Sequence, residues 1–335
     1  MKVLKVIGYL LLALLVLVPT VLWVGSYFSL DHDGLHTEAT LQLPEFEATA
    51  SAGAQPTLSQ IRAGDFTYRA RTAGFGNSVG NVILLHGFPE SSAMYVDMIP
   101  ALATAGYQVV AFDQRGYSPG ARPDDVAAYT TDKLVADVFA VADAVGFEQF
   151  HLVGHDWGAA VGWAAVFTQS ERILSWSALS IPHLGAYGEA IATDPDQQSR
   201  SAYIGFFQLP FLPEAIFSFN GFNMMKTGVY ADHGDETLAE YMALFSEPGA
   251  LTASLNWYRA SELANPEGDF HVQIPTALIW GEHDPVVGES ALMAQEKYFQ
   301  GNLWKTKLDT GHWLMETHVQ EVTVAVLENL ARITD

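Results

Sequence analysis

The 335-residue sequence contains no cysteine. Disulfide bonds, a thiol nucleophile and cysteine-bound metal are therefore excluded, although this absence alone does not identify a compartment. Basic residues are also scarce, because 16 Lys and Arg stand against 38 Asp and Glu and the formal net charge is −22. A chain this acidic repels a phosphate backbone, so we expect no nucleic-acid partner.

Charged residues of both signs make up only 16% of the sequence, whereas hydrophobic residues make up 49%. This balance is typical of a folded chain with a large buried core and not of an acidic disordered tail. The length is enough for one large domain or two ordinary ones.

The N-terminal segment differs from the rest of the chain, because residues 6–30 contain no Asp, Glu, Lys or Arg. An apolar stretch of about 20 residues matches the hydrocarbon core of a bilayer when it is helical. Lys2 and Lys5 precede this stretch, and positive residues favour the cytoplasmic side. We therefore expect residues 1–30 to be a transmembrane anchor or a signal segment. The membrane would be a partner, and the following chain would be anchored outside the cytoplasm, or periplasmic or secreted after cleavage.

Residues 31–62 have no clear period and are expected to form a linker. From Gly64 onward, strand-like runs alternate with helix-like runs, which predicts an α/β fold with a mostly parallel sheet covered by helices on both faces. Strands are expected at residues 81–85, 108–112, 149–153 and 276–280, and helices at residues 131–145 and 316–333.

The strand expected at 149–153 runs into Gly154-His155-Asp156-Trp157-Gly158, and a helix-like run follows. A residue between two glycines at such a turn is held on a sharp corner, with its side chain exposed above the sheet. Asp156 occupies this position and is the candidate nucleophile. The pentapeptide alone would fit equally well an aspartate that caps the following helix.

Other segments supply the groups that such a nucleophile requires. After strand 81–85, the backbone N–H of Phe88 can lie beside that of Trp157 and form an oxyanion hole. Asp284 follows strand 276–280, and His312 lies in a loop before the last helix. Nucleophile, acid and histidine thus occur in the chain order of an α/β-hydrolase triad, so we expect Asp156, Asp284 and His312 to act together.

Three motifs resemble those of the soluble-type epoxide hydrolases of the α/β-hydrolase superfamily. They are His86-Gly87-Phe88-Pro89, Asp113-Gln114-Arg115-Gly116-Tyr117 and Gly154-His155-Asp156-Trp157-Gly158. The resemblance implies that residues 63–181 and 270–335 form an α/β-hydrolase core, and that residues 182–269 form a helical cap with two tyrosines that hold the epoxide oxygen. Matched by sequence, these are Tyr203 and Tyr258. The sequence departs from the family after Ser91, where an expected tryptophan is missing.

The residue types suit this chemistry. An aspartate carboxylate is an anion at neutral pH, needs no activating base, and can attack a saturated carbon to form an ester. His312, oriented by Asp284, can then activate the water that cleaves the ester. The expected function is conversion of a small apolar epoxide to a vicinal diol, without metal or organic cofactor.

A haloalkane dehalogenase with the same Asp-His-Asp triad is the alternative. A departing halide needs N–H donors, and Trp157 offers one, whereas the side chain of Phe88 offers none. A tethered binding protein on a degenerate hydrolase fold is disfavoured, because nucleophile, acid and histidine are all present.

Overall fold

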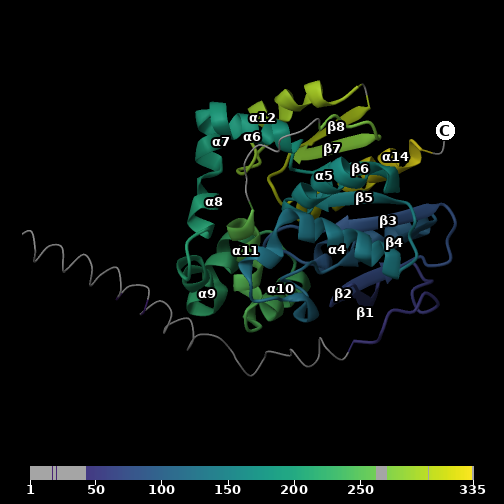
Figure 1. Cartoon of the computed structure of the whole chain (residues 1–335), viewed down its shortest axis with the longest axis horizontal. Helices are drawn as coiled ribbons and strands as arrows, with labels where there is room; N and C mark the ends of the chain where they lie inside the picture. The colour runs from purple at the N-terminus through teal and green to yellow at the C-terminus, as the bar shows by residue number, and fades with distance from the viewer. Residues whose placement is uncertain (1–16, 18–19, 21–42, 262–269, 301, 334–335) are drawn as a thin grey trace, which may run out of the picture.

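The computed structural model describes residues 17, 20, 43–261, 270–300 and 302–333. Its centre is an eight-stranded sheet in the order β1-β2-β4-β3-β5-β6-β7-β8 (Figure 1). The strands are β1 (Thr57–Ala63), β2 (Phe66–Ala73), β3 (Gly80–Leu85), β4 (Tyr107–Phe112), β5 (Phe150–His155), β6 (Ile173–Leu179), β7 (Thr276–Gly281) and β8 (Leu303–Leu308). β2 pairs antiparallel with β1 and β4, and all the other pairings are parallel.

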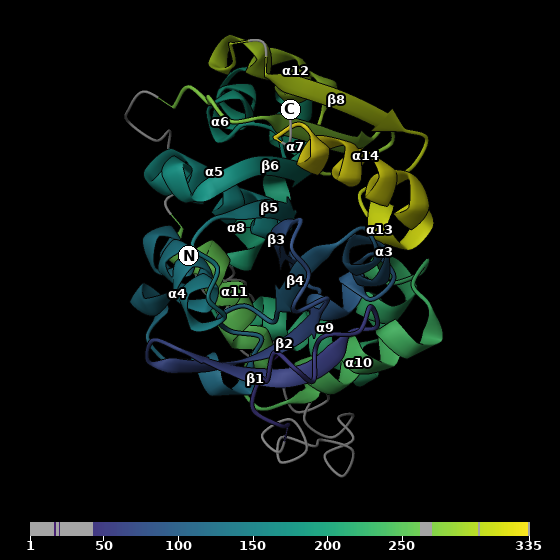
Figure 2. The same cartoon turned by 90° about the vertical axis from the view of Figure 1, so that its right-hand side faces the viewer.

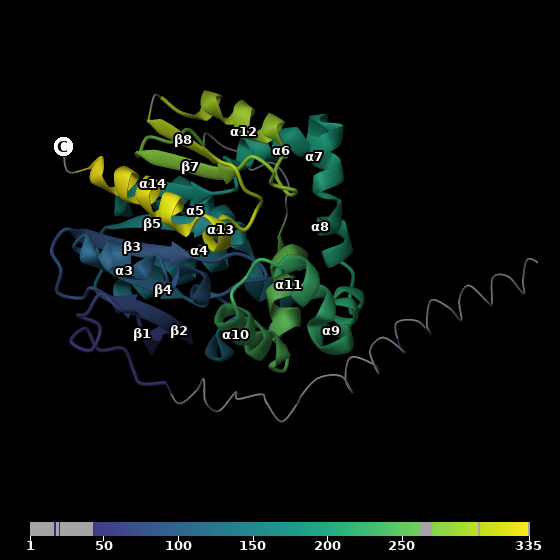
Figure 3. The same cartoon turned by 180° about the vertical axis from the view of Figure 1, so that it is seen from behind.

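Helices follow most of the parallel strands. The core helices are α3 (Ile99–Thr104), α4 (Thr131–Ala144), α5 (Trp157–Gln169), α12 (Glu289–Ala294), α13 (Leu314–Thr317) and α14 (Val319–Ala331). Helices α4 and α5 lie on one face of the sheet, and α3, α13 and α14 lie on the other (Figures 2 and 3). Short 3-10 helices lie in the connections at η2 (Ser92–Tyr95), η3 (Pro119–Ala121), η4 (Val126–Tyr129), η5 (Ser170–Arg172) and η7 (Gln295–Tyr298).

The central strands read as continuous apolar runs because both of their faces are buried. Successive residues of β3 alternate between two hydrophobic clusters: Ile83 and Leu85 belong to the cluster that contains α4 and α5. Val82 and Leu84 belong to the cluster that contains α3 and α14. This double burial explains why β3, β4, β5 and β7 are recognisable in the sequence by their uninterrupted apolar residues.

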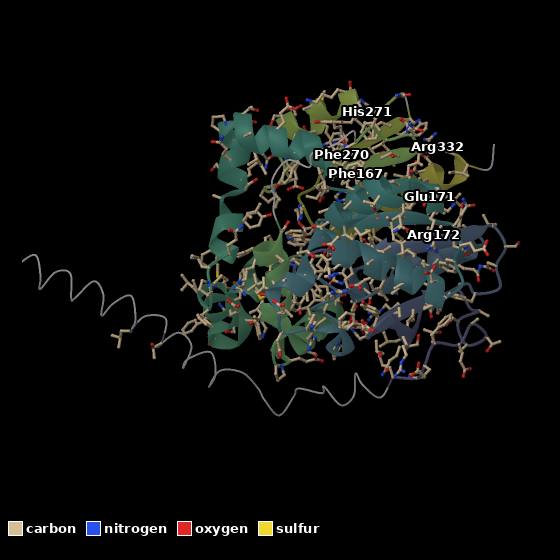
Figure 4. All side chains as sticks on the ribbon, viewed as in Figure 1. Phe167, Glu171, Arg172, Phe270, His271 and Arg332 are labelled. Carbon is tan, nitrogen blue, oxygen red and sulfur yellow. The ribbon has the colours of Figure 1, made fainter. Side chains whose placement is uncertain are left out.

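Between β6 and β7 the chain forms a group of helices on one side of the sheet (Figure 1). They are α6 (Leu184–Thr193), α7 (Pro195–Arg200), α8 (Ala202–Phe207), α9 (Leu212–Met224), the π-helical turn η6 (Met225–Val229), α10 (Asp235–Ser246) and α11 (Ala250–Ala260). Where the chain returns to the sheet, Phe270 packs on Phe167 of α5 with ring centroids 4.7 Å apart (Figure 4). This contact holds the returning chain against α5.

Two expectations for the N-terminal part need correction. Part of the range 31–62 is not a linker, because Thr57–Ala63 forms β1 and pairs along its whole length with β2. Among the residues that the structure describes, no helix has the length and apolar character needed to cross a bilayer. The segment 1–30 lies almost entirely outside the described residues, and the membrane partner and the anchored, exported location expected from it are withdrawn.

Candidate active site

Asp156 stands alone at the turn between β5 and α5. Its φ of 51° and ψ of −119° are unusual for a residue with a side chain, as expected for a strained corner that presents a reactive group. The corner requires neighbours without side chains. A Cβ on Gly158 would lie 2.2 Å from the carbonyl oxygen of Leu85, and a Cβ on Gly87 would lie 2.5 Å from the Cβ atom of Asp156.

The three predicted triad residues meet at this corner. Nδ1 of His312 lies 2.8 Å from Oδ2 of Asp284, and Nε2 of the same ring lies 3.5 Å from Oδ2 of Asp156. The second carboxylate oxygen of Asp284 accepts hydrogen bonds from the backbone N–H groups of Val286 and Val287. Asp284 is therefore held on both oxygens, and its hydrogen bond orients the imidazole of His312 toward Asp156.

Opposing effects set the ionisation of this pair. Burial favours the neutral imidazole, but the negative charge of Asp284, its hydrogen bond and the nearby charge of Asp156 outweigh this effect, so the pKa of His312 is raised well above its usual range. Burial likewise opposes ionisation of Asp284, but His312 and the two backbone donors lower the pKa of this carboxyl group. Both shifts favour the charged forms of His312 and Asp284.

The expected oxyanion-hole residues lie beside the nucleophile. The backbone N–H of Phe88 donates to Oδ1 of Asp156 over 2.9 Å. Trp157 is the first residue of α5, directly after the corner. Because Oδ1 is engaged by Phe88, Oδ2 is the oxygen that faces His312 and remains available for other contacts.

A cavity of about 400 Å³, its open mouth included, lies above Asp156. It is lined by Asp156, Trp157, Ala160, Ile181, Leu184, Tyr187, Tyr203, Ile204 and Tyr258. The predicted tyrosines thus come from two separate helices, α8 and α11, into the cavity that contains the nucleophile, and their ring centroids are 6.2 Å apart. The volume suits a small ligand.

Both tyrosines are protonated donors at neutral pH. Burial, followed by the charges of nearby acids and tyrosines, raises the pKa of Tyr203 well above its usual range. Burial does the same for Tyr258, and a hydrogen bond from the Trp157 indole partly offsets this increase.

Tyr187 also lines the cavity and was not anticipated from the sequence. Its hydroxyl lies 3.3 Å from Oγ of Ser201, and burial raises its pKa to about 12. The chain contains 13 tyrosines, and no motif around Tyr187 marks it as a site residue. Its place in the cavity follows from the fold, which brings α6 beside Asp156.

The loop motif Asp113-Gln114-Arg115-Gly116-Tyr117 braces the core and does not reach the cavity. Oδ1 of Asp113 accepts from the backbone N–H of Ser92, and Oδ2 accepts from Arg69. Arg115 makes a two-bond ion pair with Asp137 of α4.

Fold and site together define an α/β hydrolase with an aspartate, Asp156, at the turn between β5 and α5. The sequence pattern of the alpha/beta hydrolase fold matches residues 80–319. Mouse Epoxide hydrolase 4 is 33% identical over 246 residues, which cover 70% of this chain and 68% of that protein. Epoxide hydrolase A of Mycobacterium tuberculosis is 32% identical over 297 residues, which cover 74% of this chain and 89% of that protein.

Solved structures agree with these sequence matches. Epoxide Hydrolase A from Mycobacterium thermoresistibile superposes with a TM-score of 0.69 at 27% identity, covering 83% of this chain and 98% of that one. This chain therefore belongs to the α/β-hydrolase family and, within it, to the epoxide hydrolases.

Proposed function

We propose that the protein hydrolyses a small apolar epoxide to a vicinal diol through a covalent ester on Asp156. The observation that carries the proposal is the convergence of Asp156, Tyr203 and Tyr258 on one cavity, with His312 behind the nucleophile. In this proposal residues 63–181 and 270–335 form the catalytic core, and residues 182–269 form the cap that supplies both tyrosines.

In the first step, Oδ2 of Asp156 attacks one epoxide carbon. A carbon–oxygen bond forms, and the bond between that carbon and the epoxide oxygen breaks with its electron pair on the oxygen. Tyr203 and Tyr258 donate hydrogen bonds to this oxygen, and one of them transfers a proton to it. Oδ1 keeps its hydrogen bond from Phe88 and becomes the ester carbonyl oxygen.

In the second step, water attacks the ester carbon of Asp156. Esterification removes the charge of Asp156, which had helped to hold the proton on His312, so the imidazole loses that proton more easily and is then able to accept one from the water. The backbone N–H of Phe88, joined by that of Trp157, stabilises the tetrahedral oxyanion. Collapse breaks the bond between the ester carbon and the oxygen that joins it to the substrate, His312 returns its proton to that oxygen, and the diol leaves with it. The carboxyl group keeps the oxygen from water and passes its proton to the tyrosinate, which restores the Asp156 carboxylate and the tyrosine.

The tyrosine hydroxyl groups that line the cavity favour epoxide opening over dehalogenation. A strongly basic alkoxide needs a proton, which phenols supply, whereas a halide needs only N–H donors. The ring of Trp157 packs edge to face on that of Tyr258 with centroids 5.0 Å apart, and the side chain of Phe88 has no donor. The relatives named as epoxide hydrolases support the same choice.

A single turnover in ¹⁸O-labelled water tests the ester. With enzyme in excess over a styrene-type epoxide, the label is expected in the carboxylate of Asp156 and not in the first diol, because water attacks the ester carbonyl. Mass spectrometry of the peptide that contains Asp156, and of the diol, shows which of the two carries the label. A labelled first-turnover diol with unlabelled Asp156 would show direct attack of water on the epoxide and refute the covalent route.

A further inference from the structure

Three buried ionisable side chains meet behind the active site, where the inserted helices contact the core. Glu90 follows β3, Glu316 lies in α13, and His233 lies between η6 and α10. The side chains of Glu90 and His233 are fully buried, and that of Glu316 is 7% exposed. One ligand atom from each lies within 4.8 Å of the others. Neither the catalytic steps above nor the substrate cavity uses these residues.

The polar atoms of this cluster are poorly satisfied. Within the described part of the chain, Oε1 of Glu90, Oε2 of Glu316 and both ring nitrogens of His233 have no partner with hydrogen-bond geometry. The ion pairs of Glu90 and Glu316 among the described residues are with histidines, and none is with Lys or Arg. Two buried carboxylates without a fixed cation are costly, and buried polar atoms normally have partners.

The distances match a tetrahedral metal site. Nε2 of His233 lies 3.3 Å from Oε1 of Glu316 and 3.6 Å from Oε1 of Glu90. Zinc–oxygen and zinc–nitrogen bonds of about 2.0–2.2 Å place neighbouring tetrahedral ligands about 3.3–3.6 Å apart. One imidazole and two carboxylates are ligands that Zn²⁺ accepts, and a water can complete the coordination.

We propose that Glu90, His233 and Glu316 form a divalent transition-metal site, suited to Zn²⁺, that joins the inserted helices to the hydrolase core. His233 is contributed by the insertion, and both carboxylates are contributed by the core, so the ion joins the two parts. The hydroxyl of Tyr230, just after η6, also donates to the carbonyl of Pro89 and holds the same junction. The site is structural and takes no part in the ester chemistry.

A shared proton is the competing way to satisfy this cluster. Burial and the charge of Glu90 raise the pKa of Glu316 well above its usual range. Burial also opposes ionisation of Glu90, but the hydrogen bond with His155 and the proximity of His233 lower its pKa. A protonated Glu316 beside an ionised Glu90 would therefore need no ion. The two arrangements differ in one measurable respect, since only the metal site binds a cation and releases a proton as it does so.

Metal binding by the full chain provides the test. After chelation and removal of the chelator, isothermal titration with Zn²⁺ is expected to show one ion bound per chain with release of protons. The melting temperature should rise by at least about 4 °C when free Zn²⁺ exceeds the Kd about 100-fold. Co²⁺ in the same site should give the visible absorption of tetrahedral coordination. A folded chain that binds neither ion would overturn the proposal and would support the shared proton.

Variants assign the ion to the cluster. Glu316→Gln keeps the shape of a protonated Glu316 and should fold, yet both it and His233→Gln should bind Zn²⁺ at least about 100-fold more weakly. Glu236→Gln is the matched control, because Glu236 lies three residues from His233 but is exposed, and it should bind as the unaltered chain does. Equal binding by all three variants would place the ion elsewhere and refute this site. These readouts do not depend on epoxide turnover, so the outcome is independent of the proposed function.

Discussion

His312 is held by Asp284 and only approached by Asp156. Its Nδ1 lies 2.8 Å from Oδ2 of Asp284, whereas its Nε2 lies 3.5 Å from Oδ2 of Asp156, beyond the usual hydrogen-bond distance. The imidazole therefore keeps its orientation when the charge on Asp156 changes. This asymmetry fits a histidine that serves the second step of the reaction and not the first, and it leads to the first prediction.

Removing the imidazole should separate the two steps. In His312→Ala, Asp156 can still attack the epoxide, but the ester should persist because its water has no base. Turnover is expected to fall at least about 100-fold, the lower end of the usual contribution of a general base. Rapid-quench mass spectrometry should detect substrate mass on the peptide that contains Asp156. The double variant Asp156→Asn/His312→Ala is the control without adduct, and a His312→Ala protein free of adduct after exposure to a reactive epoxide would contradict the mechanism.

The two tyrosines should control ester formation. Tyr203→Phe and Tyr258→Phe should each slow single-turnover alkylation, by about 100-fold for the more important donor, and the double variant should lose it almost completely. Tyr187→Phe is the matched control, because Tyr187 lines the same cavity but its hydroxyl lies within hydrogen-bond distance of Ser201. Alkylation at the unaltered rate in the double variant would exclude the tyrosines from the reaction.

The ionisation of His312 should depend on Asp156. The negative charges of Asp284 and Asp156 raise the pKa of His312 against the effect of burial, so Asp156→Asn should lower this pKa. Below the raised pKa the ring is protonated, and ester hydrolysis needs the neutral ring. In the ester Asp156 carries no charge, so the pKa of His312 is lower there than in the free enzyme. Hydrolysis of the ester should therefore speed up as the pH rises through this lower pKa of His312. NMR titration of the ring protons of His312 in both proteins measures the shift. An unchanged or higher pKa in Asp156→Asn would contradict this account.

The backbone packs so closely around the turn at Asp156 that a methyl group at position 158 should not be tolerated. In Gly158→Ala the new Cβ would lie 2.2 Å from the carbonyl oxygen of Leu85, so we expect a loss of about 1–3 kcal/mol in the free energy of unfolding, together with lower activity. Gly205→Ala in α8 is the control. Its Cβ meets nothing within 4 Å, and alanine favours the helix over glycine by about 0.5–1 kcal/mol. Urea unfolding of both variants gives the comparison, and equal stability of the two would show that the corner is not tightly packed.

Half of the sheet was evident from the sequence. The four expected strands correspond to β3, β4, β5 and β7, whose buried faces produce uninterrupted apolar runs. Strands β1, β2, β6 and β8 were not expected. β8 carries lysines and exposed positions along an edge, and β1 was assigned to a linker because its polar residues, such as Gln60 and Arg62, hide the strand pattern.

The sequence by itself determined the order of nucleophile, acid and histidine and the glycines that the sharp corner needs, because each belongs to a short segment whose local geometry its own residues dictate. The tertiary structure alone decided which distant side chains share a space. It brought Tyr187 over Asp156, and it placed Glu90, His233 and Glu316 together in the interior. Such proximity follows from how helices pack across a sheet, and no local pattern of residues encodes it.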